Sequence, residues 1–346
     1  MKKALNILFV RNRAPNPFIR ILAEGITTDY FHVDSGVNPF WDLNREYDIL
    51  QIHWPEFFFY SNKKNLPTKE FGERLYDTLQ KRKKAGTKIV YTMHDETTHY
   101  VESRDVRTNL YEIIESNADA MVHLGNFSKN KMNKSESINC PIQAVIPHHI
   151  YDTFYPRSVS REEARNVLGI EEKFKVILTF GTYRNEEENL LVKNAFEQLN
   201  VPEKFLLAPA WYHDGWHEYK NNRITLTGNC MLGQGTVENK MLPYYFTAAD
   251  VVFIHRLHNL NSGNLPMGFY YNKTVVAPAI GNLTEYIDNV NNFSFNPHDP
   301  SSVLSGLKKG IERSSYPQEN EVYAREQWNT AKTCELYKQL YLQLTQ

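Results

Sequence analysis

Short apolar runs alternate with longer amphipathic stretches along this chain, and that alternation limits the folds it can adopt. In the first half, the runs with the character of buried strands cover residues 4–10, 48–52, 88–93, 118–124 and 143–146. Stretches with helical spacing, such as 69–84 and 103–115, lie between them. Strands that alternate with helices are typical of a parallel sheet covered by helices on both faces. The first half therefore predicts an α/β domain.

The same alternation restarts after residue 156. Ser160 and Glu163 form a capping box, so a helix is expected from there to the stop signal at Gly169. Asp299 and Pro300 open another helix, because proline is favoured at the first helical position. Further strands are predicted at residues 174–180, 204–208, 223–226, 251–254 and 274–277, and one long helix at residues 321–344.

The chain has 346 residues, which is more than a single hydrophobic core usually serves. We therefore predict two domains, residues 1–155 and residues 156–320, followed by the helical segment 321–346. Apolar residues make up 41% of the chain and charged residues 23%, which are ordinary values for a globular protein. A folded two-domain α/β protein is therefore the expectation.

Charge and cysteine usage narrow the class of partner and the compartment. The net charge of −1 gives no long-range attraction to nucleic acid, so no nucleic-acid partner is expected. The three cysteines, Cys140, Cys230 and Cys334, are far apart in the sequence and fit a reducing compartment better than a disulfide framework. The first apolar run is too short for a signal peptide, and no run reaches the ~20 residues of a membrane span. A cytoplasmic location is predicted.

A polar loop follows the predicted strand 251–254 and carries the residues Asn261, Ser262, Gly263 and Asn264. Ser262 or Asn261 can cap the helix that follows, and Gly263 lets a ligand approach the backbone. Free N–H groups at a helix start form an anion site that suits a diphosphate. The alternative is a helix cap that binds no ligand.

The sequence around this loop resembles the C-terminal half of bacterial GT-B glycosyltransferases that build surface polysaccharides. Residues 242–252, LPYYFTAADVV, are similar to the helix and "ADV" strand before the family's donor loop. Residues 272–286, NKTVVAPAIGNLTEY, are similar to the "GKPVIAP" strand and "G…PE" turn after it. The resemblance implies two Rossmann-like domains facing each other across a cleft. It also implies an acceptor-binding N-domain, a donor-binding C-domain and a C-terminal helix that crosses back to the N-domain.

The same resemblance implies further donor contacts. Gly181 and Arg184 end a segment similar to the strand and turn that open the family's donor domain, where the arginine reaches the donor diphosphate. The alternative for Arg184 is a surface ion pair with one of the glutamates 186–188. Glu285 occupies the "PE" position, which implies contact with the nucleoside. Its alternative is a charge placed at a helix N-terminus.

In the N-domain, the resemblance extends to the ends of two predicted strands, which carry His53 with Glu56 and His94 with Asp95. Glycosyl transfer requires a group that removes the acceptor hydroxyl proton, or one that steadies charge at the reacting carbon. Asp95 is the candidate base, and His94 the candidate contact to donor sugar or phosphate. The alternative is that both only cap the next helix. His53 and Glu56 are candidates of the same kind, and Asn16 lies where family members present a loop to the ligand or simply make a turn.

The chain also departs from the family pattern. Many retaining members carry two glutamates around the donor loop, and Asn259 and Met267 stand at those positions here. The stereochemical outcome therefore cannot be transferred. The lysine that often follows the phosphate-binding arginine is also replaced, because Asn185, Glu186 and Glu187 occupy that stretch.

Several common site motifs are absent from the sequence, namely D-x-D, G-x-G-x-x-G, G-x-x-x-x-G-K-[ST] and H-E-x-x-H. We therefore expect neither a metal nor a cofactor, with the nucleotide sugar acting as co-substrate. His213 and His217 could form a metal pair, although a loop with two histidines is the alternative.

The hypothesis is transfer of a hexosyl group from a UDP- or GDP-sugar to a glycan or lipid-linked glycan. One alternative is a nucleotide-sugar epimerase of the same fold, and another is a degenerate module that binds without turnover. The aromatic run 57–60 and the basic run 81–84 could contact the inner face of a membrane. The alternatives are a buried aromatic run and a solvated helix end.

Overall fold

The computed structural model describes residues 4–11, 16–59, 68–96, 104–134, 140–212 and 224–346. The chain divides into two compact units. Unit 1 contains Met1–His149 and Thr330–Gln346, and unit 2 contains Ile150–Asn329. The first boundary lies six residues before the expected joint after residue 155, and the return to unit 1 begins at Thr330 rather than near residue 321. Each unit contains a six-stranded parallel sheet, so the predicted α/β class is confirmed.

Unit 1 is built on a sheet with the strand order β2-β1-β3-β4-β5-β6. Its strands are β1 Leu5–Val10, β2 Phe31–Ser35, β3 Ile49–Ile52, β4 Lys88–Met93, β5 Ala120–His123 and β6 Ile142–Val145. The sequence pattern located all of them except β2. That strand lies at the sheet edge and buries only Phe31, so the continuous apolar run that marks a central strand is missing.

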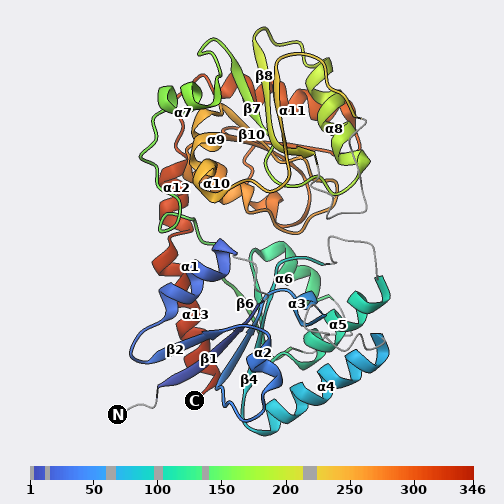
Figure 1. Cartoon of the computed structure of the whole chain (residues 1–346), viewed down its shortest axis with the longest axis vertical. Helices are drawn as coiled ribbons and strands as arrows, with labels where there is room; N and C mark the ends of the chain where they lie inside the picture. Colours follow the sequence, from blue (N-terminus) through green and yellow to red (C-terminus); the bar gives the residue numbers. More distant parts are fainter. Residues whose placement is uncertain (1–3, 12–15, 60–67, 97–103, 135–139, 213–223) are drawn as a thin grey trace. The chain divides into compact units, whose positions relative to one another are not determined.

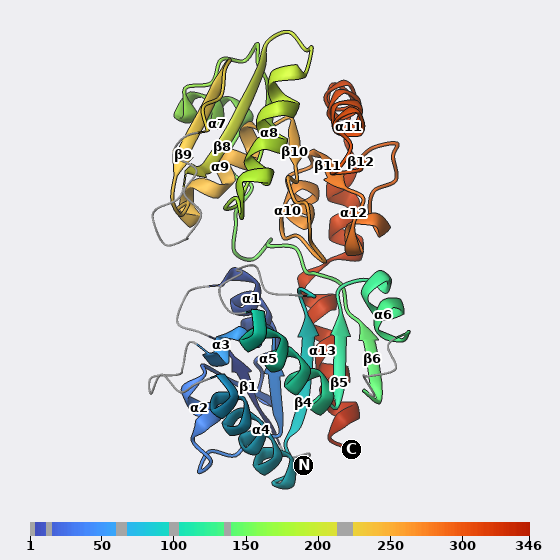
Figure 2. The same ribbon diagram turned by 90° about the vertical axis from the view of Figure 1, so that its right-hand side faces the viewer.

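Helices cover both faces of this sheet (Figure 1). Helices α1 (Pro17–Ile26) and α13 (Thr330–Leu344) lie side by side on one face, and α4 (Thr68–Lys84) and α5 (Arg104–Asn117) lie on the other (Figure 2). Successive strand residues point to opposite faces, so Ile7 and Phe9 pack toward α1 and α13 while Leu8 is buried toward the other side. The described part of unit 1 also contains the short helices α2 (Asn38–Trp41), α3 (Glu56–Phe59) and α6 (Asn126–Met132).

Two tyrosines dock α13 onto the sheet through hydrogen bonds. The Tyr341 hydroxyl donates to Gln51 Oε1 at 2.8 Å, and the Tyr337 hydroxyl lies 3.0 Å from Thr92 Oγ1. Gln51 and Thr92 are fully buried strand residues, so these bonds satisfy polar groups that would otherwise be costly in a core. The last helix is therefore an integral part of unit 1.

The single long helix expected at residues 321–344 is in fact two helices. Helix α12 (Asn320–Gln327) belongs to unit 2, and α13 begins three residues later. At the break, the Trp328 carbonyl accepts a hydrogen bond from the Ile150 N–H at 2.9 Å, and the Trp328 ring is buried against Phe269 and Tyr286. The local periodicity continues through the break, but these tertiary contacts end the first helix.

Unit 2 has the strand order β12-β11-β10-β7-β8-β9. Its strands are β7 Lys175–Leu178, β8 Lys204–Tyr212, β9 Cys230–Gln234, β10 Val251–Phe253, β11 Thr274–Pro278 and β12 Phe293–Phe295. The predicted strand at 223–226 is wrong, because residues 224–227 form no strand and the edge strand is β9. Ile224 and Leu226 are apolar because they pack against the core, which is why the pattern there was misleading.

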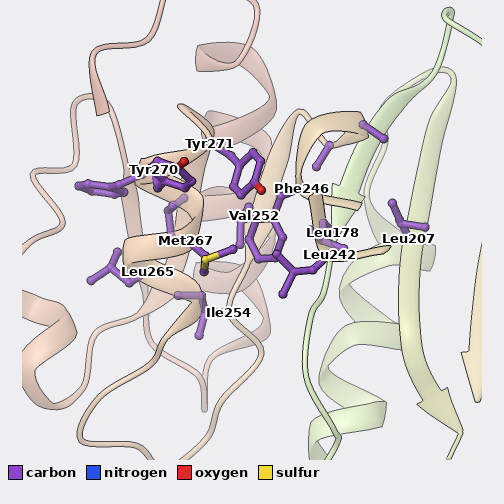
Figure 3. Packing of buried hydrophobic residues seen from close by; sticks show 14 of the residues in the cluster. Leu178, Leu207, Leu242, Phe246, Val252, Ile254, Leu265, Met267, Tyr270 and Tyr271 are labelled. Carbon is purple, nitrogen blue, oxygen red and sulfur yellow. The ribbon is translucent and has the colours of Figure 1, made fainter. Parts of the chain in front are cut away.

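Two hydrophobic cores flank this second sheet. One lies under α7 (Arg161–Leu168), α9 (Leu242–Ala248) and α10 (Asn264–Tyr270), and Figure 3 shows Leu178 and Val252 packing there with Phe246 and Met267. The other lies under α8 (Glu186–Gln198) and α11 (Pro300–Arg313). Two short 3-10 segments, η1 (Asn239–Met241) and η2 (Gly281–Glu285), complete the unit.

The predicted helix signals of unit 2 are confirmed. Ser160 Oγ accepts from the Glu163 N–H at 3.1 Å, and Gly169 ends α7 in the left-handed region with φ of 66°. Asp299 Oδ1 accepts from the Ser301 N–H at 2.9 Å and caps α11. Short-range hydrogen bonds of this kind can be recognised from a few consecutive residues.

Asp250, the aspartate of the "ADV" segment, is buried in the unit 2 core. Its carboxylate accepts from Arg165 Nη2 at 2.9 Å, from Arg161 Nη1 at 2.8 Å and from the Val176 N–H at 2.8 Å. Arg165 is fully buried and also donates to the carbonyls of Ala248, Glu171, Glu172 and Phe174. Asp250 therefore joins α7 to the starts of β7 and β10.

Several residues of the aromatic run 57–60 and the basic run 81–84, which could have contacted a membrane, instead make contacts within unit 1. Phe58 is fully buried, and Phe59 packs edge-on against Phe71. In the basic run, Arg82 is buried and donates to four backbone carbonyls, while Lys83 pairs with Asp119. Tyr60 lies outside the described residues. No helix in the described part of the chain is both long and apolar enough to cross a membrane.

Candidate functional site

Each sheet has one point where the strand order reverses. In unit 1 the reversal lies between β1 and β3, and in unit 2 it lies between β7 and β10. Ligands of open parallel sheets bind beyond the carboxyl ends of the strands at such a reversal. The loops after β7 and β10, and those after β1 and β3, are therefore the expected ligand positions.

In unit 2, Gly181 lies directly after β7 and faces the loop after β10. Its φ is +95°, and a Cβ built on it would lie 3.1 Å from Arg256 Nη2 and 3.9 Å from Asn264 Nδ2. The Asn264 side chain donates to the Phe180 carbonyl at 2.6 Å. The two loops thus meet at Gly181, which needs glycine both for its conformation and for the close approach.

Arg256 is the main residue that sequence reasoning missed. Its Nη1 donates to Glu188 Oε2 at 2.6 Å and to the Thr182 carbonyl at 3.0 Å, whereas Nη2 lies against Gly181. The Arg256 side chain is 10% exposed, and that of Glu188 is 2% exposed. One sequence signal could have pointed to Arg256: it is a charged residue just beyond the buried strand β10. The chain also lacks the lysine that often follows the family's phosphate-binding arginine, so a second cation was to be looked for elsewhere.

Arg184 belongs to the same loop cluster. Its Nη1 donates to the His258 carbonyl at 2.9 Å, and its backbone N–H donates to Glu188 Oε2 at 2.8 Å. Glu188 thus contacts the backbone of Arg184 and forms an ion pair with Arg256. Two guanidinium groups are therefore held by one network at the reversal point of the sheet.

The residues of the predicted donor loop are locked to the loop after β11. Asn261 Oδ1 accepts from Asn282 Nδ2 at 2.7 Å, and the Asn282 N–H donates to the Leu260 carbonyl at 2.9 Å. Gly281 has φ of +53°, and a Cβ there would lie 2.6 Å from the carbonyl oxygens of Asn259 and Leu260. The position of Asn261 therefore depends on the glycine at 281.

We expect Gly281→Ala to displace this loop and to lower the stability of unit 2. The new methyl group would collide with backbone atoms, and the positive φ adds strain, so a loss of roughly 1–3 kcal/mol is expected. Urea unfolding would measure it. The matched control is Gly86→Ala, which also has a positive φ (+95°) but has no atom within 4 Å of the added Cβ. Equal losses in the two variants would show that the contact with Leu260 is unimportant.

The start of α10 differs from the predicted anion site. The Asn264 N–H donates to Ser262 Oγ at 3.3 Å, the Leu265 N–H donates to the Ser262 carbonyl at 3.1 Å, and Pro266 has no N–H. The helix is only seven residues long, and Gly263 adopts a right-handed conformation that any residue can take. The amides of Asn264 and Leu265 are thus used within the chain, and Arg184 and Arg256 supply cationic groups in the same loop cluster.

Glu285 is exposed at the last residue of η2. The alternative reading, a charge at a helix N-terminus, is therefore wrong because the residue stands at the other end of its segment. Its contact with a nucleoside stays a prediction.

In unit 1, His94 follows β4 and is held on three sides. Its Nε2 lies 3.0 Å from His53 Nδ1, and the Trp54 ring stacks on it with centroids 4.0 Å apart and an interplanar angle of 18°. The Phe18 ring meets it edge-on at 4.9 Å and 90°. Only 6% of His94 is exposed. An imidazole enclosed in this way has little rotational freedom.

Asp95, the residue after His94, and Glu56 both have hydrogen-bond partners within unit 1. Asp95 Oδ2 accepts from Trp54 Nε1 at 3.3 Å. Glu56, the first residue of α3, accepts from the Tyr111 hydroxyl at 3.0 Å, and burial raises the pKa of that hydroxyl. The next described helix, α5, begins at Arg104, and residues 97–103 lie outside the described residues, so the alternative that His94 and Asp95 cap a helix stays open.

Two predicted cleft residues turn out to have internal roles. Asn16 Oδ1 accepts from the N–H groups of Phe18 and Ile19 at 3.0 and 3.4 Å, so Asn16 is the cap of α1. His53 is fully buried, and burial together with neighbouring His149 lowers its pKa to about 3. His53 has no exposed surface to offer an acceptor, and its Nδ1 lies 3.0 Å from His94 Nε2.

A separate groove with a cavity of about 310 Å³ lies between α8 and α11. Leu190, Leu191, Leu257, Val303 and Leu304 supply most of its apolar walls, and none of the predicted donor residues lines it. His213 and His217 lie outside the described residues. Among residues that the structure describes, no three His, Cys, Asp or Glu side chains are grouped to hold a metal.

Solved structures with the same arrangement cover nearly the whole chain. Sucrose-phosphate synthase from Thermosynechococcus elongatus aligns with a TM-score of 0.71 and 14% identity, over 98% of this chain and 99% of that one. HepE from Anabaena, in complex with UDP and glucose, aligns at 0.68 and 15%, over 97% and 99%. The catalytic domain of Arabidopsis thaliana starch synthase IV, bound to ADP and acarbose, aligns at 0.65 and 10%, over 99% and 100%.

These structural neighbours are GT-B glycosyltransferases. This chain has the GT-B fold. The identities are low, so the likeness establishes the arrangement of strands and helices. No protein-family model and no curated protein sequence matches the chain. What a GT-B chain of this kind does must therefore be argued from its own residues.

Proposed function

We propose that this chain is a glycosyltransferase that takes a sugar from a nucleotide diphosphate donor. The observation that carries the proposal is the pair of guanidinium groups, Arg184 and Arg256, at the reversal point of the unit 2 sheet. Guanidinium is the side-chain group best suited to bidentate phosphate contact. The structural neighbours bound to UDP with glucose and to ADP with acarbose support the same class of donor.

The finer form of the proposal concerns donor, acceptor and location. We propose a hexosyl donor linked to UDP or GDP, and a glycan or lipid-linked glycan acceptor in surface polysaccharide synthesis. The resemblance of residues 242–287 to such enzymes supports this choice. The proposed location is the cytoplasm or the inner face of its membrane, and no metal or cofactor is required in this scheme.

The residues divide the proposed reaction between the two units. The bond between the anomeric carbon and the diphosphate breaks, and a bond from the acceptor oxygen to that carbon forms. Arg184 and Arg256 stabilise the negative charge that develops on the leaving diphosphate. Asp95 takes the acceptor hydroxyl proton, and His94 contacts the donor sugar or phosphate. In unit 2, Asn264 keeps the arginine loops together through its bond to Phe180.

Thermal unfolding of the whole chain with UDP, GDP, CMP, ADP and their sugars tests the donor site. A ligand at 100 times its dissociation constant stabilises a protein by about 2.7 kcal/mol, which is readily detected. We expect one nucleotide diphosphate to raise the unfolding temperature, and Arg184→Ala to weaken that ligand by roughly 10- to 100-fold. Lys308→Ala changes an exposed cation of α11 and is the matched control.

The outcomes separate the proposal from its rivals. No response to any nucleotide would contradict the donor site and favour a module without turnover. Once the nucleotide is known, the matching sugar is incubated with and without an acceptor glycan. An altered sugar without acceptor would identify an epimerase, whereas a product that requires acceptor supports the transferase.

A further inference from the structure

His53 is buried beside the proposed active-site imidazole, with His149 also close enough to affect its charge. Its Nδ1 lies 3.0 Å from His94 Nε2. Its ring centroid lies 5.6 Å from that of Phe9 and 5.5 Å from that of Phe18. Its other nitrogen, Nε2, is enclosed and has no hydrogen-bond partner among the described atoms. Its low pKa means that the ring is neutral near pH 7 and carries a single proton.

The location of that proton determines the form of His94. If it were on His53 Nε2, a buried N–H donor would be left without an acceptor, which is the rarer and costlier defect in protein interiors. If it is on Nδ1, the N–H donates to His94 Nε2, and only a lone pair remains unused. The second arrangement makes His94 Nε2 an acceptor, so the single proton of a neutral His94 resides on Nδ1.

We propose that His53 is a positioning residue that holds His94 in the tautomer with its proton on Nδ1. The consequence for catalysis rests on the proposed glycosyltransferase function. The donor of the His94 ring is then its Nδ1–H, and its Nε2 is engaged with His53. This arrangement suits contact with a sugar oxygen or a phosphate, and it leaves proton removal from the acceptor to Asp95.

The surrounding rings strengthen this assignment because they prevent a ring flip. Trp54 covers one face of His94, and Phe18 meets the ring edge-on. Phe18 is itself fixed, since its carbonyl lies 3.0 Å from His149 Nε2 and its ring stacks on His149 at 4.5 Å. If the His94 ring were turned by 180° while these neighbours stayed in place, its Nε2 would move away from His53 Nδ1 and that contact would be lost.

Nitrogen NMR on the full chain labelled with ¹⁵N-histidine tests the proposal without any substrate. His94 is assigned by the loss of its signals in His94→Gln. We expect wild-type His94 to show a protonated Nδ1 and an unprotonated Nε2 at pH 7. In His53→Leu, which fills similar space but cannot donate, we expect a mixture of the two tautomers. A protonated Nε2 in the wild type, or an unchanged tautomer in His53→Leu, would overturn the proposal.

A second variant separates positioning from packing. In His53→Asn, the amide can donate from the place of Nδ1, so we expect the His94 tautomer to be retained at least in part. With donor and acceptor present, kcat should fall roughly 10²-fold in His53→Leu and less in His53→Asn, with a smaller change in KM. Equal rates and equal spectra in the two variants would show that His53 only fills space. If neither the wild type nor any variant turns over a donor, the glycosyltransferase proposal fails. The NMR spectra still decide whether His53 sets the His94 tautomer.

Discussion

A double variant with Arg256→Met and Glu188→Gln is expected to lose nucleotide diphosphate binding while unit 2 stays folded. Arg256 Nη2 lies at Gly181, where the loops after β7 and β10 meet. Two charge-assisted hydrogen bonds to phosphate, worth about 1.5–3 kcal/mol each, correspond to a loss of roughly 10²- to 10⁴-fold in affinity. Because charge develops on the leaving group, kcat should also fall by roughly 10²–10³. Calorimetric titration and initial rates measure these effects.

The second substitution makes the experiment interpretable. Arg256→Met alone would leave the Glu188 carboxylate buried without its cation, and breaking a buried pair in this way costs about 3–5 kcal/mol. Glutamine keeps an oxygen that can accept from the Arg184 N–H, which now donates to Glu188. Glu188→Gln alone is the control for loss of the carboxylate: it leaves Arg256 without its anion and should lower the stability of unit 2, but it keeps both guanidinium groups and should therefore still bind nucleotide. If the double variant binds nucleotide with wild-type affinity, Arg256 does not contact the diphosphate.

Asp250→Asn is expected to destabilise unit 2 by about 3–5 kcal/mol, because it removes the buried anion of Arg165 and leaves only the exposed Glu172 beside it. Arg165 has a side-chain exposure of 1%, and Asp250 of 6%, so solvent cannot replace the lost charge. The substitution keeps the size of the side chain, and the loss is therefore electrostatic. Urea unfolding at neutral pH, followed through the unit 2 tryptophans, measures the change in midpoint.

Glu172→Gln provides the matched control for Asp250. Glu172 contacts the same two arginines, Arg161 and Arg165, but its side chain is 58% exposed. Exposed ion pairs contribute about 0–1 kcal/mol, so only a small change is expected. Similar losses in the two variants would contradict the view that burial gives the Asp250 pair its importance.

Much of the fold could be predicted because the relevant signals are local. A strand buried on both faces is a continuous apolar run, which is how β1, β4 and β10 were located. The cap at Ser160 and the stop at Gly169 depend on hydrogen bonds within a few residues. Three of the four edge strands, β2, β9 and β12, were missed because an edge strand need not be apolar throughout, whereas the fourth, β6, was located as residues 143–146.

The candidate site could be predicted only in part. His94, Asp95, Gly181 and Arg184 could be named as candidates because each follows a predicted strand in a segment that resembles the family, and their roles stay predictions. Arg256 was missed because its importance depends on Gly181 and Glu188, which lie more than 65 residues earlier in the chain. Ser262 or Asn261 was expected to cap the helix beside free amides for an anion, and the structure shows the Ser262 oxygens accepting the N–H groups of Asn264 and Leu265.

By itself the sequence determined the α/β class, most central strands, the helix caps and the strand ends that carry polar residues. These features follow from periodicity and short-range hydrogen bonding, which a few consecutive residues express. Only the tertiary structure decided that β10 lies beside β7 and β4 beside β3, and hence that Arg256 meets Gly181 and His53 meets His94. The physical reason is that strand order is set by the packing of the whole sheet, and no local pattern contains it.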